Sequence, residues 1–116
     1  MVSLNYQHAE LASGRWKTFT LCEQLANVGS EVFRALSWQH DPVICKAAFY
    51  RALELMDLTI QNATGFYRLR ELARIRELLT DYFTNVNEYQ TSSEYWKTLF
   101  MQFTTAAAIE RKLRSQ

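Results

Sequence analysis

The hydrophobic and polar positions of the chain follow a helical period over most of its length. Between Lys17 and Gln39, apolar residues recur every three or four positions, so at about 100° per residue they share one continuous arc. The same period returns three more times, and the segments are separated by Pro42, by Gly65 and by a polar stretch after Phe83. The pattern predicts four helices, with the approximate bounds 17–39, 42–62, 66–83 and 92–114.

Residues at the expected helix boundaries agree with this division. Asp41 followed by Pro42 ends the first helix and starts the second, because Asp is a good N-cap and proline fits the first helical position. The sequence TSSE predicts a capping box at the fourth helix, with Thr91 as N-cap and Glu94 three residues later.

Four helices of this length, joined by short loops, predict an all-α fold, an antiparallel up-down-up-down four-helix bundle. The 116 residues suit one hydrophobic core and not two, so residues 1–116 are expected to form a single domain. Residues 1–14, which end at Ser13 and Gly14, are expected to form a short helical arm outside the bundle.

Composition narrows the range of partners. The formal net charge of +1 argues against a protein built mainly to neutralise a phosphate backbone, so a nucleic-acid partner is not favoured. No apolar signal region follows Met1, and no run approaches the length of a membrane span. The sequence therefore predicts a cytoplasmic protein with no membrane partner.

The residues that commonly hold metals or cofactors are few and scattered. Cys22 and Cys45 lie inside apolar helical patterns without metal-ligand spacing, so they are interpreted as reduced core thiols. His8 and His40 lie in different segments, and the chain has no Gly-rich phosphate loop and no HExxH motif. The sequence predicts neither a metal site nor a cofactor.

Two charged residues interrupt the apolar stripes of their helices. They are Arg76 and Glu110. If the third and fourth helices pack as an antiparallel pair, Glu110 lies level with Arg68; the candidate carboxylates for Arg76 are Glu31 on the first helix and Glu54 on the second. An unpaired buried charge is costly, so each residue needs a partner or a route to solvent. Three hypotheses remain open for Arg76: an internal ion pair that fixes helix register, a polar cleft that binds a ligand or a partner's carboxylate, and a side chain that extends to the bundle surface.

In the segment RALSWQH, near the end of the first helix, five residues separate Arg34 from His40. This Arg-x5-His arrangement resembles the active-site motif of the HEPN superfamily, whose helical domains often cleave RNA without metal, usually across a dimer. The resemblance implies that Arg34 holds a phosphate and that His40 moves protons. The alternative is that they are two unrelated residues at a helix end.

A related hypothesis is an RNA-binding bundle that uses the arginines of the third helix. Arg68, Arg70 and Arg74 give this helix a basic side, although Glu71 and Glu77 interrupt it. Such binding would rest on contacts with phosphates and would weaken with salt.

A second resemblance covers most of the chain. The runs ANVGSEVFRALSW, AFYRALELMDLTI and RLRELARIREL look like a small set of prokaryotic helical proteins without an assigned activity. This resemblance implies the same fold and supplies no activity, cofactor or catalytic residue.

The sequence as a whole favours a non-enzymatic bundle that binds another protein or a second copy of itself, most simply as a homodimer. Sixteen aromatic residues are more than a four-helix core of this size readily buries, and exposed aromatic residues mark interfaces. The predicted partner surface combines such aromatic residues with two arginines: Trp16, Phe19, Trp38, Tyr50, Tyr67, Arg70, Arg74 and Tyr89.

Overall fold

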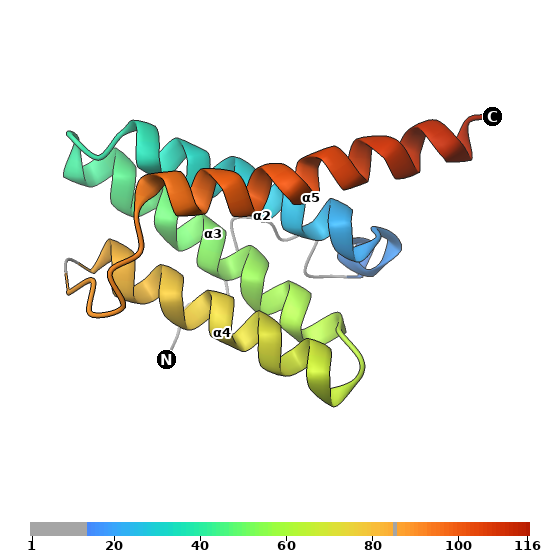
Figure 1. Cartoon of the computed structure of the whole chain (residues 1–116), viewed down its shortest axis with the longest axis horizontal. Helices are drawn as coiled ribbons and strands as arrows, with labels where there is room; N and C mark the ends of the chain where they lie inside the picture. Colours follow the sequence, from blue (N-terminus) through green and yellow to red (C-terminus); the bar gives the residue numbers. More distant parts are fainter. Residues whose placement is uncertain (1–13, 85) are drawn as a thin grey trace.

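A computed structural model of the chain describes residues 14–84 and 86–116. These residues form one short 3-10 helix and four α-helices: η1 (Arg15–Thr18), α2 (Leu21–Ser37), α3 (Pro42–Asn62), α4 (Phe66–Phe83) and α5 (Ser93–Arg114). Consecutive α-helices run in alternating directions, so the antiparallel up-down-up-down bundle is confirmed (Figure 1). The predicted arm over residues 1–14 lies outside the described residues, apart from Gly14.

The first predicted helix begins later than its apolar period suggested. Thr20 is the N-cap of α2, its hydroxyl accepts from the amide of Glu23, and the Glu23 carboxylate accepts from the amide of Thr20. This capping box starts the helix at Leu21. The preceding residues 15–18 form η1 instead, where Trp16 is fully buried and its ring Nε1 donates to the Thr59 hydroxyl at 3.1 Å.

The predicted capping box at the fourth helix is wrong by one residue. Ser92 is the N-cap of α5, and its hydroxyl accepts from the amide of Tyr95. The hydroxyl of Thr91 accepts instead from the ring Nε1 of Trp96 at 3.2 Å. Thr91 therefore satisfies a buried indole, because Trp96 has no exposed surface.

The four helices pack in the spatial order α5, α2, α3, α4. Contacts are extensive between α2 and α3 and between α2 and α5, sparser between α3 and α4, and fewest between α4 and α5. The rings of Tyr82 and Trp96 join α4 to α5 near the end of one helix and the start of the other, with centroids 6.5 Å apart. The sequence-based register, which made the third and fourth helices neighbours along their length, is therefore wrong, because the fourth helix packs on the first.

A glycine explains why α5 packs on α2. Gly29 is buried in the middle of α2, and a Cβ atom built on it would lie 2.8 Å from the Cβ of Phe100 on α5. Glycine inside a helix costs about 1 kcal/mol relative to alanine. The close approach of the two helices offsets that cost, since it buries Phe100 and Trp96 completely.

We expect Gly29→Ala to destabilise the protein by about 1–2 kcal/mol, the net of an overpacking cost and a gain in helix propensity. The measurement is the free energy of unfolding from urea denaturation. The control is Ser30→Ala, because the neighbouring Ser30 is exposed and its hydroxyl donates to the Ala26 carbonyl of the same helix, so the substitution tests helix propensity and one local hydrogen bond. A Gly29→Ala variant as stable as Ser30→Ala would contradict the packing argument.

Candidate functional site

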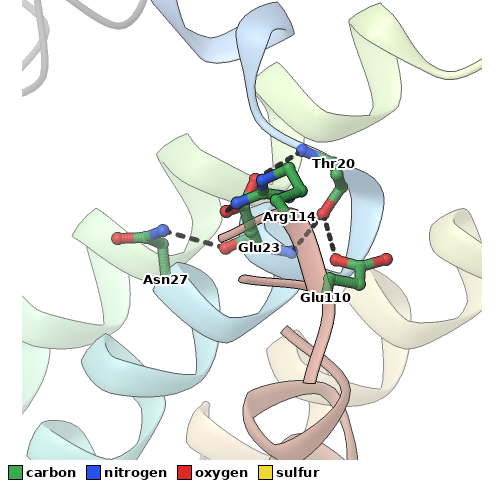
Figure 2. A network of polar contacts seen from close by, with 5 residues as sticks. All are labelled: Thr20, Glu23, Asn27, Glu110 and Arg114. Carbon is green, nitrogen blue, oxygen red and sulfur yellow. Dashed lines mark hydrogen bonds and ion pairs between the residues drawn. The ribbon is translucent and has the colours of Figure 1, made fainter. Parts of the chain in front are cut away.

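A polar network ties the C-terminal part of α5 to the N-terminus of α2 (Figure 2). The Thr20 hydroxyl donates to Glu110 Oε1 at 2.6 Å, and Arg114 Nη2 donates to Glu23 Oε2 at 2.8 Å. Glu110 therefore faces the cap of α2 and not Arg68, which is exposed. The expected pairing of Glu110 with Arg68 fails because α5 lies against α2.

The same contacts set the charge state of Glu23. The amide of Thr20 donates to its carboxylate and Arg114 pairs with it, and together they hold the pKa of Glu23 below its usual value. The side chain of Glu23 is 16% exposed, so solvent screens this pairing only in part.

The two cysteines are not activated nucleophiles. Burial raises the pKa of Cys22, as does the neighbouring Glu110 carboxylate, and burial raises the pKa of Cys45. A thiol with a raised pKa is mostly protonated near neutral pH, and the thiolate is the reactive form. Both cysteines are free.

Arg76 pairs with a residue that the sequence interpretation did not consider. Its Nε donates to Asp57 Oδ1 at 2.7 Å and its Nη2 to Asp57 Oδ2 at 3.4 Å. Of the two carboxylates expected to pair with it, Glu31 contacts Arg51 at 3.3 Å, and neither it nor Glu54 pairs with Arg76. The side chains of Arg76 and Asp57 are 38% and 46% exposed, so this is a surface pair between α3 and α4 that contributes at most about 1 kcal/mol.

The residues of the RALSWQH motif have separate neighbours. Arg34 is exposed on the last turns of α2, and its Nε lies 3.7 Å from Glu31 Oε1. His40 follows the end of the helix and stacks on the ring of Trp38, with centroids 5.3 Å apart. Each side chain interacts with a neighbour close in sequence, and a joint chemical role for the two stays a prediction.

The expected partner surface divides into buried and exposed members. Trp16 is a core residue, which corrects the predicted surface. Phe19 is half-buried, and its ring lies edge-to-face with that of Trp16. The helical period of the sequence did not predict that the Trp16 ring would donate a hydrogen bond to Thr59, which lies far from it in the sequence. The remaining aromatic and arginine members are exposed: Trp38, Tyr50, Tyr67, Arg70, Arg74 and Tyr89.

A larger surface feature lies on α5 and was not identified from the sequence. No residue from Thr98 to Ile109 is charged, although many of them face solvent. We call the exposed arc opposite Trp96, Phe100 and Ala107 the uncharged face of α5; it consists of Thr98, Met101, Gln102, Thr105, Ala108 and Ile109. The outer face of a surface helix normally carries charged residues, so this run was a signal that the sequence already contained.

Comparisons with known proteins found no similar family, protein or structure. No family model matches the chain, and searches of curated proteins and of solved structures return no match. Over residues 14–84 and 86–116, no helix has the length and apolar character needed to cross a membrane. In the same part of the chain, no group of three or more His, Cys, Asp or Glu side chains is placed to hold a metal ion.

The lowered pKa of Glu23 predicts a pH-dependent contribution to stability. A carboxyl that titrates below its unfolded value of 4.5 stabilises the fold fully above about pH 5, and this contribution is lost as pH falls through the native pKa. We expect Glu23→Gln, whose amide oxygen can still accept from the Thr20 amide, to lower the unfolding free energy at pH 7 by about 0.3–1 kcal/mol, the usual contribution of a negative charge in the first turn of a helix, and by less at pH 3. Urea denaturation at both pH values measures the difference, and Glu77→Gln, at an exposed site on α4, is the control. An equal loss at both pH values would show that Glu23 does not act through its charge.

Proposed function

We propose that the protein is a non-enzymatic helical module that works by self-association, with the uncharged face of α5 as the contact between two copies. The observation that carries this proposal is the absence of charge on a solvent-facing helix surface over Thr98–Ile109. Met101 and Ile109 on this face are 52% and 55% exposed in the single chain. Burying them in a second copy would remove apolar surface from water.

The shape of the face suits a second helix. A shallow hollow of about 650 Å³ extends along α5. It is lined by one cation and otherwise by uncharged side chains: Lys97, Thr98, Met101, Gln102, Thr105, Ala106 and Ile109. Threonine and alanine are short, so they allow a second helix to approach to the usual interaxial distance of about 8–10 Å.

A second copy of this chain fits the lack of charge better than an unrelated partner does. A two-fold axis brings each residue near it against the same residue of the other subunit. A charged residue there would meet its own charge, whereas the uncharged face of α5 avoids this repulsion. Glu94, Lys97 and Lys112 lie at the two ends of the face and would form a polar rim.

We expect the wild-type chain to be a homodimer at micromolar concentrations and Met101→Glu to be a monomer, because the substitution places like charges at the contact. Sedimentation equilibrium over a wide concentration range measures both masses. Val86→Glu is the matched control, since Val86 is 66% exposed in the loop between α4 and α5. A wild-type chain that stays monomeric at every concentration, or a Val86→Glu variant that dissociates as Met101→Glu does, would contradict the proposal.

A further inference from the structure

The end of α2, the start of α3 and the end of α4 lie at the same end of the molecule (Figure 1). A second hollow lies there. It has a volume of about 460 Å³, within the usual range of small-molecule sites of about 300–1,000 Å³. Its lining comes from the turn after α2, the first half of α3 and the last turn of α4: Gln39, Pro42, Cys45, Lys46, Phe49, Tyr50, Tyr82, Phe83 and Thr84. We call it the α3–α4 groove.

Aromatic rings form much of the wall of the α3–α4 groove. The rings of Phe49 and Phe83 lie 5.1 Å apart between centroids, and those of Phe49 and Tyr50 lie 5.7 Å apart. Phe49 is 6% exposed, which fixes its ring in the core, whereas Tyr50 is 52% exposed at the rim. Fixed rings of this kind favour a flat apolar body, which can stack on or pack edge-to-face against them.

The groove carries one formal charge at neutral pH. Lys46 is the only lysine, arginine, aspartate or glutamate among the nine lining residues. Its ammonium lies 5.7 Å from the centroid of the Tyr50 ring, and within the described chain no carboxylate forms an ion pair with it. Cys45 is neutral there, because burial raises its pKa. The local charge therefore favours an anion.

The opposite wall supplies polar groups that can exchange partners. Gln39 Nε2 donates to the Tyr82 hydroxyl at 3.4 Å, a long and weak hydrogen bond on an exposed edge. A ligand group could replace either partner at little cost, because both side chains can also bond to water.

From these three features we infer that the α3–α4 groove binds a small aromatic anion. The flat body packs against Phe49, Tyr50 and Phe83, the anionic group binds the ammonium of Lys46, and a polar edge reaches Gln39 and Tyr82. This site is separate from the uncharged face of α5, and no residue lines both hollows. Ligand binding here and self-association through α5 can therefore succeed or fail independently.

The test uses two probes of similar shape on the full chain. 8-Anilinonaphthalene-1-sulfonate is an aromatic anion, and N-phenyl-1-naphthylamine is its uncharged analogue. We expect the anion to bind more tightly than the neutral probe, and amide chemical shifts in a nitrogen-edited NMR titration to move around Lys46, Tyr50 and Thr84. Shifts confined to α5, or equal affinity for the two probes, would overturn the inference.

Lys46→Met isolates the role of charge. We expect it to weaken binding of the anion about tenfold or more, the effect of losing one charge-assisted hydrogen bond, and to leave the neutral probe unchanged. Lys17→Met is the matched control, because it removes an exposed lysine from η1, away from both hollows, and should change neither affinity. If Lys46→Met and Lys17→Met lower the affinity for the anion equally, general electrostatic attraction explains the binding and the site is disproved.

Discussion

The arrangement of this bundle depends on the close approach of α2 and α5 at Gly29. Only hydrogen at that position lets the Cβ of Phe100 come so near the backbone of α2. The contact brings Trp96, Phe100 and Ala107 into the core, and so it determines which arc of α5 is buried. The opposite arc, the uncharged face of α5, is then left to solvent. The exposure of Met101 and Ile109 thus follows from one missing side chain on another helix.

Polar contacts at the C-terminal end of α5 hold it on α2, where Glu110 and Arg114 bind the capping box formed by Thr20 and Glu23. At the N-terminal end of α5, the Trp96 ring donates to Thr91 in the preceding loop and contacts Tyr82 of α4. Because α4 packs mainly on α3, the four helices form two extensive interfaces and a sparser one between α3 and α4. This leaves more exposed helix surface than a closed bundle would, and it accounts for the many exposed apolar residues on α4 and α5.

Helix number, helix direction and most helix ends could be predicted from the sequence, because they depend on local period and on residues such as Asp41 and Pro42. The pairing of helices could not. It depends on the close contact between Gly29 and Phe100. These residues lie on different helices, and no local sequence pattern predicts that they touch. The error for Glu110 follows from that pairing, since the wrong neighbouring helix supplied the wrong partner. Arg76 pairs on the same helix as the expected Glu54, but three residues further along, at Asp57. The predicted exposure of Trp16 was wrong for a related reason. Its ring is buried with a hydrogen bond to Thr59, an acceptor 43 residues away in the sequence. The sequence already shows the uncharged run from Thr98 to Ile109. Which of its residues face water depends on the packing of α5 against α2.

We propose that the uncharged face of α5 is buried between two copies of the chain. The most direct measurement uses methyl-labelled methionine in the intact protein, with a soluble paramagnetic gadolinium chelate added at several protein concentrations. Met56 is fully buried and serves as an internal reference, whereas Met101 is half exposed in the single chain. We expect the Met101 methyl signal to broaden at low protein concentration and to become protected, approaching Met56, as the concentration rises. A Met101 signal that broadens equally at every concentration would contradict this burial.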